Sequence, residues 1–598
     1  MSLLQATIIG LIALILTPGY LFYFDITPKA AVLLAGAAAL LIFGARQRTV
    51  ARQRTFGLLL LLNFASLILS TVLSSNPALS LYGSTWRRLG LVVQCAAMLF
   101  AWLVASHCTG RPERVRTILR GIALTGILSA AYGIAQYFGW DPLVPKAAYH
   151  IGEGIWTIVR PPGALGYASY FATWLLVTIF LCLAMAATET GTLWRRVAIA
   201  AALLALVAML LTGTRAAVLG LLAGGAVWLY WRGFRSARRL LAIAAALALC
   251  GAAFYFSPPG RQMRSRARWF SEDPWGGARP LLWRDSLRMA SHRLAAGYGP
   301  EVFYGAFPRF ESKELSRAYP DFAHESPHNI FLDVLVAQGI PGLAILAGLC
   351  AIGFAAAWRL NRAQPAAARC LAAALAAGIA SQQFTAFTAP TAVIFFTVIA
   401  LILAHSKEAE LSRPHVVFAA AAPLVALALL YAALRLTVAD HALAQSRRAL
   451  ESGDIRASVT AYENYRRWRL PGASADLWYS RAWLDLAHKT SDINVLAQCF
   501  AQAEDFAFRA TETAEDPFDA WYNLAQIYAL HNDYAGTEKS LRAAIARHPT
   551  WFKPHWTLAQ VLQMQSRLEE ARMEAALALE YDAGKHPEVA QTLESLRP

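Results

Sequence analysis

Residues 3–24, LLQATIIGLIALILTPGYLFYF, carry no charged side chain over a length that can cross a bilayer core as a helix. The stretch lacks the basic start and the small-residue cleavage site of a secretory signal, so it predicts a retained membrane helix. Similar apolar runs follow, and together they predict about thirteen membrane helices. The predicted spans are 5–23, 29–44, 56–73, 89–107, 117–138, 167–187, 196–212, 215–231, 238–256, 335–357, 368–386, 388–405 and 414–436.

The composition of the whole chain agrees with this pattern. Its 598 residues are 57% hydrophobic and 15% charged, and the mean hydropathy of +0.40 lies outside the usual balance of soluble domains. The net charge of +16 does not indicate nucleic-acid binding, because the cations lie between apolar segments, where membrane topology explains them. The seven cysteines show no spacing typical of a disulfide framework or a zinc cluster. The sequence predicts an all-α, polytopic membrane protein.

The distribution of Lys and Arg predicts the orientation of the helices. Basic residues concentrate in five connections, which the positive-inside rule places in the cytoplasm: 45–55, 109–116, 193–196, 231–239 and 358–369. The outward-facing connections are then 75–88, 139–166 and 257–334, and the tail after residue 436 also faces outward. The loop 257–334 departs from the rule, because four arginines lie just beyond a membrane helix: Arg261, Arg264, Arg266 and Arg268. Either long loops translocate regardless of charge, or these arginines line a site for a polyanion such as a diphosphate.

The tail has an internal repeat. DAWYNLAQIYALHNDYAGTEKSLRAAIARHP (519–549) and KPHWTLAQVLQMQSRLEEARMEAALALEYD (553–582) align at an offset of 34 residues, the period of a tetratricopeptide repeat. With weaker copies between 442 and 487, we predict a tetratricopeptide-repeat α-solenoid over 437–598, made of about three to four units. Such a surface binds partner proteins, or it only stabilises the external face of the molecule.

Residues 324–328, HESPH, match the H-E-x-x-H motif of zinc proteases. That motif needs both histidines one turn apart on a helix, but Pro327 pushes the residue before it out of the helical region. The following stretch contains a single carboxylate, Asp333, so a third metal ligand is missing and we predict no metal site.

A helix start is the better interpretation of the same residues. We expect Ser326 to be the N-cap and Pro327 the first helical residue, with His328 next. The positive end of the helix dipole then disfavours protonation of His328 and keeps the imidazole neutral. A neutral histidine at the outer edge of the membrane can act as a general base, or it only caps the helix start.

Several blocks resemble those of a known family. HNIFLDVLVAQGIPGL (328–343) resembles the H-N-x-x-L-x-x-L-x-x-x-G-x-x-G-L motif of the O-antigen ligase and polymerase superfamily. ARPLLWRDSLRMASHRLAAGYGPEVFYGAFPRF (278–310) resembles the family's segment with an Arg, a Trp four residues later and a G-x-G-P turn. Other similar blocks follow the family's order: SSNPALSLYGSTWRRLGL (74–91), GIAQYFGWDPL (133–143), RPPGALGYASYFATWL (160–175) and LTGTRAAVLGLL (211–222). Ligases, repeat-unit polymerases and protein O-oligosaccharyltransferases share these blocks.

The resemblance implies a fold and a reaction. It implies a GT-C-like transmembrane glycosyltransferase domain over 1–436, with an external catalytic loop at about 257–334. The implied reaction is a metal-independent, inverting transfer without cofactor, from an undecaprenyl diphosphate carrier to an acceptor hydroxyl at the outer face of the bacterial inner membrane. His328 matches the family's base, and His324 is a supporting candidate. The expected contacts of the donor diphosphate are Arg215, Arg279, Arg160 and Arg87. Each arginine could instead reach a phospholipid phosphate.

The acceptor and some wider alternatives stay open. We favour ligation of O-antigen to lipid A-core, with repeat-unit polymerisation second and transfer to a protein Ser or Thr third. The expected partners are the lipid-linked donor, the acceptor, membrane lipids and a protein bound by a tail that faces the periplasm, but not nucleic acid. A transporter would keep polar sites at the bilayer midplane, whereas here they gather in the outer loops. A scaffold that only recruits partners is the other non-enzymatic alternative.

Overall fold

The computed structural model describes most of the chain. The described residues are 1–45, 50–51, 53–151, 158–233, 245, 248–249, 251–253, 255–257, 264, 277–405, 411–412 and 416–596. The span predicted at 238–256 and the arginines predicted at 261, 266 and 268 fall largely or wholly outside these residues.

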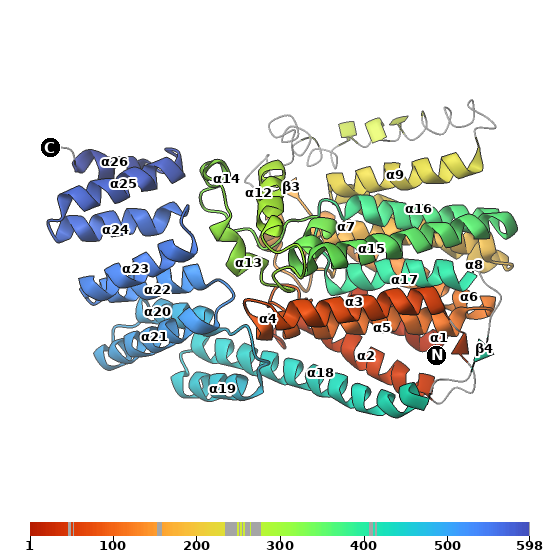
Figure 1. The fold of residues 1–598 in the computed structure, drawn as a ribbon, viewed down its shortest axis with the longest axis horizontal. Coiled ribbons are helices and arrows are strands. Elements are labelled where there is room, and N and C mark those ends of the chain that lie inside the picture. Colours follow the sequence, from red (N-terminus) through yellow and green to blue (C-terminus); the bar gives the residue numbers. More distant parts are fainter. Residues whose placement is uncertain are drawn as a thin grey trace.

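The described chain is almost entirely helical (Figure 1). Within it, eight helices are long and apolar enough to cross a membrane. They are α2 (Thr27–Ala45), α3 (Arg54–Val72), α5 (Leu91–Cys108), α6 (Pro112–Tyr137), α7 (Ala168–Thr188), α8 (Thr192–Leu211), α15 (Ile330–Ala363) and α18 (Val416–Glu451). Helix α9 and three shorter apolar helices join them: α1 (Ser2–Leu14), α9 (Arg215–Arg232), α16 (Pro365–Ser381) and α17 (Ala389–His405). Most of these helices coincide with the predicted spans, and the prediction of an all-α polytopic membrane protein is confirmed. The span predicted at 5–23 was too long, because α1 ends at Leu14 and the backbone is extended at Ile15.

The helices form a bundle around α7 and α17. All residues of α17 from Ala389 to Ala404 are buried, and α7 is buried over most of its length. Small residues allow close packing, as where Gly133 of α6 meets the ring of Phe171. Thr173 and Ser381 share a buried hydrogen bond of 2.7 Å between α7 and α16. The two most buried helices thus lie in the interior, where lipid cannot reach them.

The connections sort to two ends of the bundle, as the charge pattern predicted. At one end a small pocket is lined by Arg116, Thr188, Gln364 and His405. At the same level, β1 (Val50–Ala51) pairs with β4 (Leu411–Ser412), two segments that both follow apolar helices. The other end faces the tail (Figure 1) and carries the remaining connections. Which membrane face each end occupies stays a prediction.

The predicted external loop 257–334 is folded in its described part. It contains α12 (Arg279–Ser291), α13 (Phe303–Ala306), the 3-10 helix η3 (Phe307–Arg309) and α14 (Lys313–Ala318), which share a core of their own. Short elements at the same end are α4 (Pro77–Tyr82), the 3-10 helix η1 (Lys146–Ala148), and the paired strands β2 (His150–Ile151) and β3 (Ile158–Val159).

Helix α15 is broken near its first third. Gly339 has φ 70° and ψ −163°, so the helix stops and restarts there. The segment before α13 docks into the break: Tyr298 N donates to Val336 O at 2.8 Å, and Ile340 N donates to Leu294 O at 2.8 Å. A Cβ on Gly339 would lie 2.3 Å from Leu294 O, so only glycine fits. The break fixes the first part of α15 against the segment that precedes it.

The tail continues from the bundle without a gap. Helix α18 runs through the boundary predicted at residue 436 and packs on α19 (Ile455–Trp468). The following helices pack in sequential pairs and end with a single helix: α20 (Asp476–Ala487), α21 (Ile493–Thr513), α22 (Pro517–Leu530), α23 (Tyr534–Arg547), α24 (Phe552–Met564), α25 (Leu568–Asp582) and α26 (Pro587–Ser595). Leu524 and Leu558, which the 34-residue offset pairs, are both buried. The tetratricopeptide assignment and the domain boundary stay predictions.

Candidate active site

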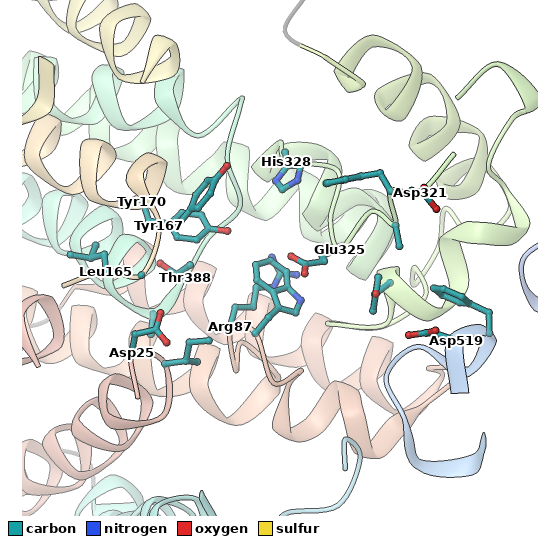
Figure 2. Close-up of a pocket in the computed structure, with 18 of the residues that line it drawn as sticks. Asp25, Arg87, Leu165, Tyr167, Tyr170, Asp321, Glu325, His328, Thr388 and Asp519 are labelled. Atoms are coloured by element: carbon teal, nitrogen blue, oxygen red, sulfur yellow. The ribbon is translucent and has the colours of Figure 1, made fainter. Parts of the chain in front are cut away.

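A cavity of about 680 Å³ lies between the tail-facing end of the bundle and the tail (Figure 2). Its walls combine segments far apart in the sequence, from the start of α2 to the start of α24. Aromatic side chains line it: Trp86, Tyr167, Tyr170, Tyr304, Phe322, Phe518 and Trp551. So do charged or titratable side chains: Asp25, Lys29, Arg87, Asp321, Glu325, His328, Asp519, His548 and Lys553. A cavity of this size, apolar in part and edged with polar groups, suits a ligand that is itself amphipathic.

His328 lies in the wall, immediately before α15. The predicted helix start was wrong, because α15 begins at Ile330 and Asn329 is its N-cap, accepting hydrogen bonds from two backbone N–H groups of the first turn. His328 instead has φ 51°, in the left-handed region. Tertiary hydrogen bonds shape this turn: Trp283 Nε1 donates to Pro327 O at 3.0 Å, and Ile330 N donates to Gln382 O at 3.1 Å. Hydrogen bonds from Trp283 and to Gln382, which are distant in the sequence, therefore stabilise the turn, rather than local helix geometry.

The same turn decides against the protease motif. His324 and His328 do not share a helix, so their side chains are not one turn apart on a common face. Among the described residues, no group of three His, Cys, Asp or Glu side chains could hold a metal ion.

The imidazole of His328 is suited to accept a proton. Burial, helped by the positive charge of Arg279, lowers the pKa of His328 to about 4, so the ring is neutral near pH 7. Ser326 Oγ lies 3.3 Å from Nδ1. In the described part of the chain, Nε2 has no hydrogen-bond partner and is left for a ligand. A half-buried, neutral histidine in a cavity wall is equipped for general-base catalysis.

Glu325 lies beside His328 and presents its carboxylate to the cavity (Figure 2). Burial by the surrounding protein raises the pKa of Glu325, and the nearby Arg87 opposes that shift only in part. From the sequence we assign Glu325 no role, because it could assist His328 or be only a polar loop residue. Among the carboxylates that line the cavity, Glu325 is the nearest to His328 in the sequence.

Arg87 is held by two carboxylates. Its Nε donates to Glu301 Oε1 at 2.6 Å, while Nη1 and Nη2 donate to the two oxygens of Asp333 at 2.7 and 3.3 Å. Glu301 also accepts a hydrogen bond from Ser84 N at 3.1 Å. The two carboxylates outweigh burial and raise the pKa of Arg87. These contacts connect the loop before α5 to α15. Arg87 also lines the cavity, so its contact with a diphosphate stays a prediction.

The other arginines predicted to bind the diphosphate, Arg279, Arg160 and Arg215, do not line the cavity. Arg279 begins α12, and its Nη2 donates to Phe384 O at 3.4 Å. The guanidinium of Arg160 lies over the ring of Tyr167, 5.5 Å from its centroid. Arg215 begins α9, directly after Thr214, whose hydroxyl contacts Ala168 O at 3.5 Å. Arg160 and Arg215 therefore flank the start of α7, while Arg279 is close enough to His328 to influence its pKa.

His324 is buried between the rings of Phe307 and Phe322, with 4% of its surface exposed. Burial lowers the pKa of His324 to about 4. Neither ring nitrogen has a hydrogen-bond partner within the described residues. It is not part of the cavity wall.

Sequence reasoning missed Lys29 and the contribution of the tail. Lys29 lines the cavity from the start of α2, and its Nζ donates to Ile15 O at 3.0 Å and to Asp25 O. The available signal was a lysine at the edge of an apolar run, four residues after an aspartate. No signal in the sequence indicated that tail residues such as Asp519 and Trp551 would meet His328 in one cavity.

A match to known proteins covers this site. Residues 200–347 match the family model described as O-antigen ligase. This part of the chain is similar to the O-antigen ligase family. A Pseudomonas aeruginosa protein described as an O-antigen ligase is 27% identical over 332 residues, which cover 53% of this chain and 69% of that relative. The segment that matches the O-antigen ligase model contains His328, Arg215 and Arg279, whereas Arg87, Arg160 and the tail lie outside it.

Proposed function

We propose that this chain is a membrane glycosyltransferase that moves a glycan from an undecaprenyl diphosphate carrier to an acceptor hydroxyl. The acceptor we favour is lipid A-core, which makes the reaction O-antigen ligation in lipopolysaccharide biosynthesis. The match of residues 200–347 to the O-antigen ligase model and the similarity to a described O-antigen ligase support this proposal. The end of the bundle that faces the tail, where the cavity lies, would then be at the periplasmic face of the inner membrane.

The donor would enter from the membrane side of the cavity. Tyr167, Tyr170 and Lys29 lie at that end, near the tops of α2 and α7, where a lipid carrier can stay in the bilayer. Lys29 offers a cation in the wall, and Arg279 offers another behind His328. Arg160 and Arg215 flank the start of α7 and would meet the diphosphate on its approach. Cations in this arrangement stabilise the negative charge of a departing diphosphate.

The base would be His328. As the acceptor oxygen attacks the anomeric carbon, its proton passes to Nε2 of the neutral imidazole. The new carbon–oxygen bond forms on the face opposite the leaving group, so the sugar configuration inverts. The bond to the diphosphate breaks, and its electron pair leaves with the phosphate oxygen. Solvent in the cavity then takes the proton from the imidazolium.

One observation carries the proposal: a neutral histidine with an unpartnered Nε2 lines a large cavity inside the segment that matches the ligase family, judged over the described residues. The test is the surface-glycan profile of the native host carrying His328→Ala, stained for lipopolysaccharide and for glycoproteins. The matched control is His292→Ala, which removes an exposed histidine at the end of α12, outside the cavity wall.

Long glycan should disappear from lipopolysaccharide in the His328 variant only, with both variants present in the membrane at wild-type amounts. Loss from glycoproteins instead would assign a protein acceptor. Unchanged glycans on every acceptor would contradict the proposal.

A further inference from the structure

We propose that the tail completes the active-site cavity with a carbohydrate subsite, in which the ring of Trp551 stacks on a sugar of the bound glycan. The inference rests on the proposed function and adds a role for a segment outside the match to the O-antigen ligase family. The glycan at this subsite belongs either to the donor or to the acceptor, because both present the same sugar chemistry.

The tail forms one end of the cavity. Phe518 and Asp519 of α22 and Trp551 and Lys553 at the start of α24 line that end, beside Tyr304. Figure 2 shows Asp519 and Asp321 on one side of His328 and Glu325, and Asp25 and Leu165 on the other. A lipid diphosphate approaches from the bundle side, so the group that reaches past the reacting carbon toward the tail is glycan rather than lipid.

The aromatic groups provide a platform for a sugar ring. Phe518 is buried at 3% exposure and packs edge-on against Trp551, with ring centroids 5.7 Å apart. Tyr522 supports Trp551 from α22 at 4.9 Å, and Tyr304 meets Phe518 at 5.8 Å. Trp551 itself stays partly exposed and lines the cavity. The apolar C–H face of a pyranose fits such a ring, whose orientation is already fixed by its neighbours.

Charged groups surround this platform and suit hydroxyl groups. Asp321 accepts from Lys553 Nζ at 2.8 Å and from His586 Nε2 at 3.1 Å, which fixes the carboxylate at the rim. Asp519 pairs with Arg481 at 2.7 Å. A sugar hydroxyl both donates and accepts hydrogen bonds, so it can use the free lone pairs of these carboxylates and the remaining N–H groups of Lys553.

The wall is fixed rather than transient, because buried contacts fasten the tail beside the subsite. His548 Nε2 contacts Glu311 Oε2 at 2.6 Å, and Thr550 Oγ1 donates to the same oxygen at 2.9 Å. Ser316 Oγ donates to Thr550 O at 2.6 Å. These side chains are buried on both sides of the contact, so solvent does not compete with them. Trp551 follows directly after Thr550 and is held in place by this connection.

The test compares Trp551→Ala with Trp556→Ala in the full-length protein in lipid nanodiscs. Trp556 is on the same helix but does not line the cavity, so its removal controls for loss of a ring. Transfer is measured with the host's lipid-linked O-antigen as donor and its lipid A-core as acceptor. Loss of one stacking contact should raise one KM about tenfold in the Trp551 variant, with kcat changed less than twofold. The Trp556 variant should keep both KM values.

Each outcome decides the inference. A higher KM for the donor assigns the subsite to the donor glycan, provided that the KM does not rise for a donor that carries only one sugar. A higher KM for the acceptor assigns the subsite to the acceptor glycan. Unchanged KM values, or a fall in kcat alone, would overturn it. Trp551→Phe keeps a smaller ring and should give an intermediate KM, so the question stays decidable if the alanine variant does not fold.

The proposed function is judged separately, by whether the wild-type protein transfers glycan at all. Without transfer, the subsite is judged by equilibrium binding of the O-antigen repeat released from its carrier. Binding that weakens about tenfold in the Trp551 variant supports the subsite, and equal binding to both proteins contradicts it.

Discussion

Replacing Arg87 by methionine should destabilise the folded protein rather than only weaken donor binding. Arg87 is 5% exposed, and its guanidinium meets Glu301 at 2.6 Å and Asp333 at 2.7 Å. Methionine keeps most of the apolar stem but leaves both carboxylates without their cation. Ser84 still donates to Glu301. Asp333 loses its charged partner.

The size of the effect follows from these contacts. Removing one partner of a buried ion pair costs about 3 to 5 kcal/mol, because the remaining charge is stranded away from water. Arg87 serves two carboxylates, so the upper part of that range applies. For a chain of 598 residues this corresponds to a fall in the unfolding midpoint of about 3 to 4 °C. The unfolding midpoint of Arg87→Lys should lie between those of Arg87→Met and wild type, since an ammonium cannot reproduce the forked geometry of the guanidinium.

The assay is the loss of folded protein on heating, followed in nanodiscs by size-exclusion chromatography for wild type and for each variant. Asp333→Asn is added to the Arg87→Met background to remove the stranded charge. The double variant should recover part of the lost midpoint, since an amide costs less to bury than an unpaired carboxylate. A methionine variant that unfolds like wild type while its KM for the donor rises would refute the reasoning, and would make Arg87 a ligand of the diphosphate.

Three further predictions concern the turn at His328 and the break in α15. The pKa of His328 near 4, below the ordinary 6.5, predicts that the transfer rate is flat near neutral pH and falls only as the imidazole gains a proton at about pH 4; a rate profile with its midpoint at 6.5 would contradict this. Trp283→Phe removes the hydrogen bond to Pro327 O and should lower kcat about tenfold without a change in the unfolding midpoint, measured in parallel; equal rates would show that the bond does not hold the turn. Gly339→Ala puts a Cβ against Leu294 O at a left-handed φ, so it should sharply reduce the yield of folded protein. A normal yield would show that the substitution does not strain the backbone there.

The sequence allowed the fold class to be predicted because a bilayer imposes a simple rule. A chain that crosses it must satisfy its own backbone hydrogen bonds over about twenty apolar residues, so the runs are visible without an alignment. The predicted spans therefore coincide with described helices such as α5 and α7, within a few residues at the ends. Clustering of basic residues likewise predicted which connections share one end of the bundle, as the pocket lined by Arg116 and Gln364 shows.

The details of the site depend on contacts that the sequence does not display. Local rules placed the helix start at Ser326, but the hydrogen bond from Trp283 to Pro327 O moves it to Ile330. Nothing in the sequence indicated that Glu301, 214 positions away, would pair with Arg87. Lys29 lay hidden at the edge of an apolar run. Trp551, more than two hundred residues beyond His328, reaches the cavity because the tail lies against one end of the bundle.

The most direct test of the account is a single-turnover transfer rate for purified His328→Gln, beside His292→Ala and wild type. Enzyme is kept in excess over the host's lipid-linked glycan, with lipid A-core present, so the chemical step is observed without product release. We predict that His328→Gln is slower by about a hundredfold to ten-thousandfold while the donor still binds, because glutamine keeps the shape of the turn but cannot accept the proton. His292→Ala should match wild type. A His328→Gln rate within about twofold of wild type would contradict the assignment of His328 as the base.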